Sequence, residues 1–147
     1  MTAVGLEDDD EMATIEDLRE IALALPGVEE RVNGHTGGPA WRVAKGDIAW
    51  MRGPSARDRA QLAERERSWP EGPVIGVRVA SLEEKEALLA AEPEFFFTIP
   101  HFDGYPGLLV RLEDVDRERL AEIIDDAWLV RAPARAAKAW LAERGLD

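Results

Sequence analysis

Residues 40–44 and 47–52 form two apolar-rich runs on either side of Lys45-Gly46, a pattern that predicts a β-hairpin. With Lys45-Gly46 as a two-residue loop, the register places Trp41 opposite Trp50. One face of the hairpin then carries Trp41, Val43, Ile48 and Trp50, and the other carries Arg42, Ala44, Asp47 and Ala49. Because a slip of one residue would turn every side chain to the opposite face, we predict that helices cover the tryptophan face.

Similar patterns recur along the chain and predict an α+β fold. Further strands are predicted over 28–32, 73–80, 95–99 and 107–112, and helices after the capping residues Thr14, Ser81 and Asp116 and from Pro133. The helix after Asp116 has the clearest apolar stripe, which we predict to face the sheet: Leu120, Ile123, Ile124 and Trp128. We therefore predict one two-layer α+β domain, in which a mainly antiparallel sheet of about five strands is packed by N- and C-terminal helices.

The segment 53–72 fits two alternatives. Ser55 with Asp58 forms a helix-capping pattern, which favours a short exposed helix. The apolar stripe that follows is poor, which fits a long loop equally well. The sequence leaves this choice open.

Length and composition limit the organisation of the chain and its chemistry. The 147 residues suffice for one domain, which we predict to span 14–147 after a disordered acidic tail over 1–13. There is no cysteine, which excludes disulfides and thiolate metal sites. No apolar run approaches the roughly 20 residues of a membrane span, and no secretory signal is present, so we expect a cytoplasmic protein. The formal net charge of −12 opposes binding to nucleic acid and to acidic membranes.

The order of these elements and three local motifs resemble one known family. The motifs are GHTGGPAWRV at 34–43, GVRV at 76–79 and FFTIPHFDGYP at 96–106, followed by Ala127-Trp128 and Arg131-Ala132-Pro133. In this combination the chain resembles the MmcQ/YjbR family. The resemblance implies a compact α+β fold similar to the "double wing" domain of a phage transcription factor, and members are often labelled DNA-binding on that likeness. The resemblance to this family identifies no catalytic residue in the chain.

Two histidines and their neighbours predict a small-ligand pocket. The candidate residues fall in or beside loops next to the predicted sheet, where binding residues tend to gather: His35, Trp50, His101, Asp103 and Tyr105. The spacing of His101 and Asp103 also suits an oriented base or two metal ligands, but catalysis needs a third group and a metal needs three or four ligands. We therefore predict no catalytic residue, no metal and no cofactor. The alternative interpretation is that His101 and Asp103 bond the local backbone and shape the turn.

Eight cationic side chains are candidate contacts for nucleic acid: Arg52, Arg57, Arg59, Arg65, Arg67, Arg131, Arg135 and Lys138. If the arginine-rich segment 52–67 is helical, positions 52, 59 and 67 would line up on it. Positions 131, 135 and 138 would share one face of the C-terminal helix. Acidic residues interleave with the first group, so we expect intrahelical ion pairs to neutralise much of its charge: Asp58, Glu64 and Glu66. A solvated face is the preferred interpretation.

Three function classes remain open at this point. The preferred one is a non-enzymatic binding domain for an unknown small molecule or protein partner. The first alternative is a DNA-binding protein, as the resembled family is often labelled, although the net charge disfavours nucleic acid. The second alternative is an enzyme of unknown reaction that uses His101.

Overall fold

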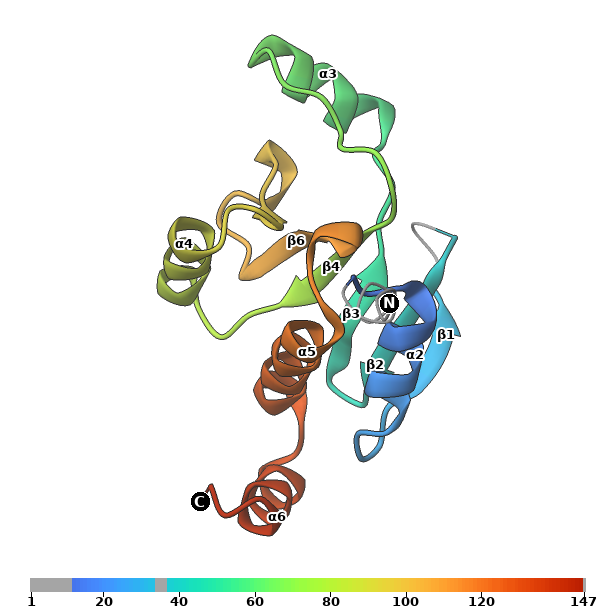
Figure 1. Cartoon of the computed structure of the whole chain (residues 1–147), viewed down its shortest axis with the longest axis vertical. Helices are drawn as coiled ribbons and strands as arrows, with labels where there is room; N and C mark the ends of the chain where they lie inside the picture. The colour runs from blue at the N-terminus through green and yellow to red at the C-terminus, as the bar shows by residue number, and fades with distance from the viewer. Residues whose placement is uncertain (1–11, 34–36, 147) are drawn as a thin grey trace, which may run out of the picture.

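The computed structural model describes residues 12–33 and 37–146, which fold around one six-stranded antiparallel sheet. Its strands are β1 (Glu29–Val32), β2 (Pro39–Val43), β3 (Gly46–Met51), β4 (Val74–Arg78), β5 (Phe96–Phe97) and β6 (Gly107–Arg111). Their spatial order is β1-β2-β3-β4-β6-β5 (Figure 1). The predicted α+β class is confirmed. The strand predicted over 95–99 is shorter than expected, because Pro100 opens a 3₁₀ turn, η1 (Pro100–Phe102).

The helices begin where the sequence placed their caps. They are α2 (Ile15–Leu23), α3 (Ala56–Glu64), α4 (Leu82–Ala91), α5 (Arg117–Arg131) and α6 (Ala134–Glu143), with a second 3₁₀ turn, η2 (Leu112–Asp114). Thr14 and Ser55 both form reciprocal capping boxes, and Asp116 accepts the backbone N–H of Arg119. The open choice at 53–72 is therefore decided in favour of a short helix. Figure 1 shows α3 at one end of the molecule and α6 at the other.

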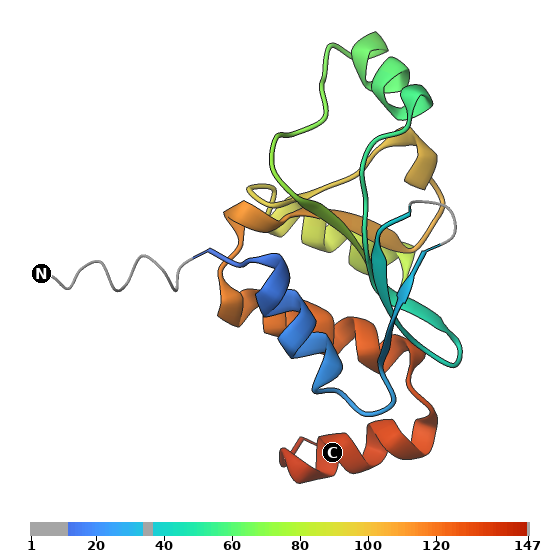
Figure 2. The same ribbon diagram turned by 90° about the vertical axis from the view of Figure 1, so that its right-hand side faces the viewer.

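The main core lies between one face of the sheet and the helices α2 and α5. Figure 2 shows these two helices packed together against the strands. The predicted stripe of α5 is confirmed, because all four of its side chains are buried in this core: Leu120, Ile123, Ile124 and Trp128. At about 25 cal/mol per Å² of apolar surface, this stripe is a principal source of the fold's stability.

A smaller core lies on the opposite face of the sheet. Its buried members are Ala40, Trp50, Leu62, Val74, Phe97, Ile99, Phe102 and Leu109. Leu62 comes from α3 and Phe102 from η1, so these two elements pack over part of that face. The sheet therefore has an apolar cluster on each side, and the second one positions the candidate site.

The predicted hairpin exists, but its predicted register is wrong. The two-residue turn is Ala44-Lys45, one position earlier than expected, and Val43 therefore pairs with Gly46. A bulge between Trp41 and Arg42 shifts the pairing again, so that Trp41 faces Ala49 and Trp50 faces Ala40. The two tryptophans consequently lie on opposite faces of the sheet: Trp41 is in the main core and Trp50 in the smaller one.

The bulge explains this outcome physically. Ile48 is the unpaired residue, and both Ile48 and Ala49 are fully buried in the main core. Two consecutive residues thus point the same way, which reverses the alternation and turns Trp50 to the other face. The stabilisation from burying one more apolar side chain in the main core outweighs the loss of regular strand pairing, which the predicted register had assumed.

Candidate functional site

A groove of about 870 Å³ lies beside the smaller core. We name it the arginine groove. Residues from β2, β3, the start of α3, η1, the end of α5 and the segments beside them line it: Asn33, Arg42, Gly46, Asp47, Trp50, Arg52, Ser55, Arg57, His101, Phe102, Tyr105 and Arg131. Because these elements are far apart in the sequence, the groove exists only in the folded chain.

Trp50 forms an aromatic wall of the groove with two neighbouring rings. Its ring centroid lies 6.5 Å from that of Phe102 and 6.5 Å from that of Tyr105, and these two rings meet edge to face at 5.5 Å. Trp50 is only 8% exposed. The indole lies over Gly76, its partner on β4, where an added Cβ would stand 2.3 Å from a ring atom. Gly76 is thus needed because the sheet and the indole approach closely.

Tyr105 lies over a glycine in the same way on the neighbouring strand, β6. An added Cβ on Gly107 would lie 2.4 Å from the Tyr105 ring, and Arg78 lies over the same ring at 5.9 Å. Glycines inside strands therefore mark both places where an aromatic ring lies on the sheet. This signal was present in the sequence, within the GVRV motif and after Tyr105-Pro106, but the pocket prediction did not draw on it.

A buried lysine holds the loop that carries the aromatic residues. Lys85 on α4 is 6% exposed, and its Nζ donates to the backbone oxygens of Phe102 at 2.6 Å and Tyr105 at 2.8 Å. Burial lowers the pKa of Lys85, and the carboxylate of Asp103 opposes that shift. The sequence pattern did not indicate this residue, because a lysine on a short helix is ordinarily exposed.

A buried ion pair fixes the α3 side of the groove. The Nη2 of Arg52 lies 2.7 Å from Asp58 Oδ2, and the two side chains are 12% and 2% exposed. Burial alone would raise the pKa of Asp58, but hydrogen bonds from Ser55 and Arg52 outweigh it, so that the pKa is lowered. The guanidinium of Arg52 also lies 5.9 Å from the rings of Trp69 and Phe102. Arg52 therefore joins the helix cap to the aromatic wall.

Arg131, the last residue of α5, reaches the other end of the groove at the hairpin turn. Its Nε donates to the backbone oxygen of Asp47 at 3.3 Å, and its Nη1 to that of Lys45 at 3.5 Å. The guanidinium crosses over Gly46, which has φ of +148° and where an added Cβ would lie 3.1 Å from Arg131 Cζ. Arg42 lies near the same place, 3.8 Å from the carboxylate of Asp47.

Arg57 stands exposed in the first turn of α3 and faces the groove. Within the described residues, no carboxylate lies within ion-pair distance of it, because the neighbouring Asp58 pairs with Arg52. Arg59 is equally exposed on the same helix but does not line the groove. Two residues correspond to a rotation of about 200° around a helix, so Arg57 and Arg59 point in nearly opposite directions.

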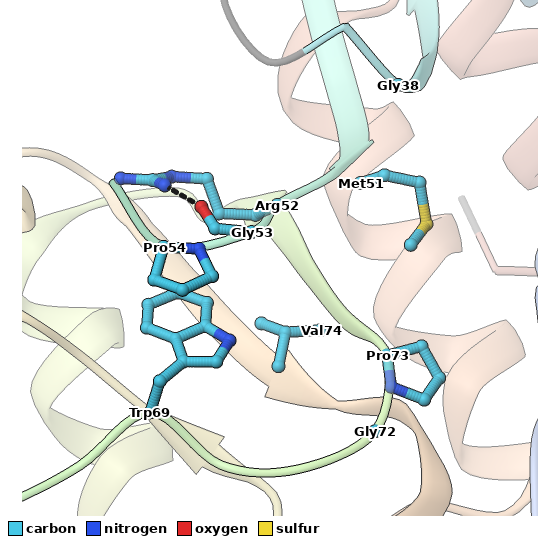
Figure 3. Close-up of a pocket in the computed structure, with 9 residues that line it drawn as sticks. All are labelled: Gly38, Met51, Arg52, Gly53, Pro54, Trp69, Gly72, Pro73 and Val74. Atoms are coloured by element: carbon cyan, nitrogen blue, oxygen red, sulfur yellow. Dashed lines mark hydrogen bonds between the residues drawn. The ribbon is translucent and has the colours of Figure 1, made fainter. Parts of the chain in front are cut away.

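A second hollow of about 350 Å³ lies beside Arg52 and is mainly apolar. It is lined by Gly38, Met51, Arg52, Gly53, Pro54, Trp69, Gly72, Pro73 and Val74 (Figure 3). The dashed line in Figure 3 is the bond from Arg52 Nη1 to the backbone oxygen of Gly53. Arg52 thus belongs to both hollows, with its charge held by Asp58 on the groove side.

The structure places the five pocket residues expected from the sequence in different positions. Trp50, His101 and Tyr105 line the arginine groove. Asp103 is exposed and does not line it, and His35 lies outside the described residues. The sequence-based prediction missed Arg42 and grouped the other arginines of the groove with a nucleic-acid surface instead.

Two expectations about the cationic residues are wrong. Helix α3 covers only Ala56–Glu64, so Arg52 and Arg67 lie outside it and cannot line up with Arg59 on one helix face. Arg131 ends α5, whereas Arg135 and Lys138 belong to α6, because the chain is extended at Ala132-Pro133. The candidate cations are instead divided differently: Arg52, Arg57 and Arg131 line the arginine groove, and the others do not.

The expected neutralisation by intrahelical ion pairs is also not found. Asp58 pairs with Arg52, which precedes the helix. Among the described residues, neither Glu64 nor Glu66 makes an ion pair with an arginine of this segment. Arg59, Arg65 and Arg67 are exposed.

Two features are absent from the part of the chain that the structure describes, a cluster of metal ligands and a membrane-spanning helix. No three of its histidine, aspartate and glutamate side chains gather into a group that could hold a metal ion. No helix in 12–33 or 37–146 has the length and apolar character needed to cross a membrane.

Comparison with known proteins identifies the family. The YjbR family model matches residues 23–130. The proteins Rv2570 of Mycobacterium tuberculosis H37Rv and Mb2600 of Mycobacterium bovis, both named as uncharacterized, are each 40% identical over 134 residues, covering 91% of this chain and all of theirs. The crystal structure of Deinococcus radiodurans DR2400, a DUF419 protein, matches with a TM-score of 0.60 and 21% identity over 92% of this chain and 91% of that one, and supports the fold. The chain belongs to the YjbR family.

Proposed function

We propose that this member of the YjbR family is a non-enzymatic protein that binds a small organic anion in the arginine groove. The observation that carries the proposal is the charge of the groove. The whole chain has a formal net charge of −12, yet the described lining of the groove has four arginines against one aspartate, and it stays positive when Asp58, the partner of Arg52, is counted as well. A concave site with one sign of charge concentrates ligands of the opposite sign.

The dimensions of the groove support a small ligand. Its volume of about 870 Å³ lies within the range of small-molecule sites, roughly 300–1,000 Å³. Arg131 is positioned by backbone oxygens and Arg52 by a buried carboxylate, so both guanidinium groups are fixed before a ligand arrives. Such preorganisation reduces the entropy cost of binding. A cytoplasmic location remains part of this proposal.

The enzyme alternative has less support. His101 is exposed, and no hydrogen bond from a described residue orients its ring as a general base requires. Asp103, the expected partner, lies outside the groove lining. Anion binding requires only the fixed positive charge of the arginines.

A nucleic acid is the second candidate, and one observation favours it. Arg59, Arg65 and Arg67 are exposed and have no ion-pair partner among the described residues. Cations in this state can meet phosphates. The net charge of −12 acts against them, because binding to a phosphate backbone depends on electrostatic attraction.

A thermal-shift titration tests the proposal, since a ligand that binds only the folded chain raises its melting temperature. The probes are inorganic phosphate, citrate, ribose 5-phosphate and AMP at low salt. We expect at least one to stabilise the wild type, Arg57→Gln to weaken that effect and Arg59→Gln, its matched control on α3, to leave it unchanged. The proposal fails if no probe stabilises the protein, or if the two variants lose the effect equally.

A further inference from the structure

We infer that the ligand of the arginine groove carries a planar ring as well as a negative charge, with the ring against Trp50 and Tyr105. This inference rests on the proposed function and narrows it to one class of anion. The groove combines two kinds of side chain: an aromatic cluster, in which Trp50, Phe102 and Tyr105 lie within 6.5 Å of one another, and the surrounding arginines. Aromatic walls favour planar rings, and guanidinium groups favour phosphates and carboxylates.

Trp50 supplies the first independent observation. The side chain is 8% exposed, and its indole N–H makes no hydrogen bond to a described residue; this N–H is not one of the enclosed polar atoms of the described residues, so a solute can reach it. The indoles of Trp41 and Trp128 by contrast donate to Glu30 and to the backbone oxygen of Pro26, each at 2.9 Å. An accessible indole N–H is a donor only and can bond a ligand without giving up a partner in the protein. A ring nitrogen or oxygen of a bound ligand is a suitable acceptor for Trp50.

The two strand glycines supply the second observation. A glycine inside a strand weakens it and leaves no side chain to pack. Gly76 and Gly107 are retained where the rings of Trp50 and Tyr105 lie on the sheet, each within 2.5 Å of where a Cβ would stand. The rings of Trp50 and Tyr105 therefore lie directly against the strand backbone. A larger residue at either glycine would push these rings outward into the groove.

The spacing along β3 sets the shape of the ligand. Arg131 and Arg42 gather at Asp47, and Trp50 follows three residues later on the same strand. At about 3.3 Å per residue, and with the bulge at Ile48 between them, these two backbone positions, at the cationic and the aromatic end, are separated by at most about 10 Å. A ligand that uses both ends is therefore elongated, with its charged group apart from its ring. Nucleoside monophosphates and aromatic carboxylates both have this form.

Four related probes separate the contribution of the ring from that of the charge: AMP, adenosine, ribose 5-phosphate and ribose. Binding is measured by calorimetry at one low salt concentration. Stacking of a base on an aromatic side chain contributes enough for AMP to bind about tenfold or more tightly than ribose 5-phosphate. Adenosine should bind more weakly than AMP, because it lacks the charge.

Substitutions at Tyr105 link the effect to the proposed place. Tyr105→Leu should reduce the affinity for AMP about tenfold while leaving that for ribose 5-phosphate unchanged. Tyr105→Phe keeps the ring and should bind AMP as the wild type does. Since Tyr105 packs on Gly107, the melting temperature of each variant is measured without ligand; if Leu unfolds the chain, the comparison of AMP with ribose 5-phosphate on the wild type decides.

The outcomes distinguish this inference from the proposed function. Equal affinities for AMP and ribose 5-phosphate would refute the ring while leaving anion binding intact. If none of the anions binds, both ideas fail. Two further probes, indole-3-acetate and a short single-stranded oligodeoxyadenylate, distinguish the sources of the same chemistry. Tighter binding of either one than of ribose 5-phosphate supports the inference and identifies the source as a free aromatic carboxylate or a nucleic-acid strand.

Discussion

Replacing Lys85 by methionine is the sharpest test of how the aromatic wall is held. Methionine nearly preserves the length of the side chain but cannot donate hydrogen bonds. The change would remove the bonds of 2.6 Å and 2.8 Å from Lys85 Nζ to the backbone oxygens of Phe102 and Tyr105. Both oxygens would then lack the donor that the folded chain supplies.

The expected cost follows from two opposing terms. Hydrogen bonds from a charged donor contribute about 1.5–3 kcal/mol each, and a buried carbonyl left unpaired costs about 1–3 kcal/mol. Removing a 6% exposed ammonium also relieves its desolvation, which works in the opposite direction. We therefore expect Lys85→Met to lower the free energy of unfolding by about 2–4 kcal/mol, less than the sum of two full bonds.

Urea unfolding followed by tryptophan fluorescence measures this change. The matched control is Glu86→Gln, an exposed neighbour on α4, which should change stability by less than about 0.5 kcal/mol. Lys85→Met should also weaken binding of the anion, because His101, Phe102 and Tyr105 lie on the loop that Lys85 holds. A variant as stable as Glu86→Gln would refute the reasoning.

The pH dependence provides a second readout with a defined sign. Because the pKa of Lys85 is lowered in the folded chain, the unfolded chain binds more protons at this site. The contribution of Lys85 to stability therefore increases as pH rises through its lowered pKa toward the ordinary lysine value of about 10.4. The difference in stability between wild type and Lys85→Met should widen over this alkaline window, and a constant difference would contradict the shift.

Three further predictions concern the core, the groove floor and nucleic acid. Ile124→Asp should unfold the domain, because Ile124 is fully buried in the main core; a soluble variant with unchanged melting would refute this. Gly76→Ala should cost about 1–3 kcal/mol in urea unfolding, since its Cβ would lie 2.3 Å from the Trp50 ring, whereas the unobstructed Gly53→Ala serves as control. Labelled duplex DNA should not bind usefully at physiological salt, because the net charge is −12; micromolar binding that weakens steeply with salt would overturn this prediction.

The features that the sequence predicted correctly depend on residues close together in the chain. Capping at Thr14, Ser55 and Asp116 involves a side chain and a backbone group three residues away, so the pattern is complete in the sequence. The apolar stripe of α5 likewise follows from helical spacing alone. Local chemistry determined these elements, and tertiary packing agreed with it.

The groove could be predicted only in part, because its charges come from distant segments. His101 and Tyr105 were predicted as pocket residues in loops beside the sheet and Trp50 as a pocket residue of the strand next to them, and all three line the groove. Arg131 reaches Asp47 across 84 positions of sequence, which no local pattern could indicate. The buried role of Lys85 was equally hidden, since its two acceptors are backbone oxygens of another segment.

The error in the hairpin and the existence of the groove have the same structural origin. In the predicted register Trp50 would join Trp41 in the main core, and the opposite face would lose its largest side chain. The bulge at Ile48 reverses the alternation, because it allows Ile48 and Ala49 to enter the main core together. Trp50 is thereby placed over Gly76, where it organises Phe102 and Tyr105 into the aromatic wall. The bulge at Ile48, which made the predicted register wrong, is therefore also the feature that places Trp50 in the candidate site. Departures from regular pairing are expected where function competes with it.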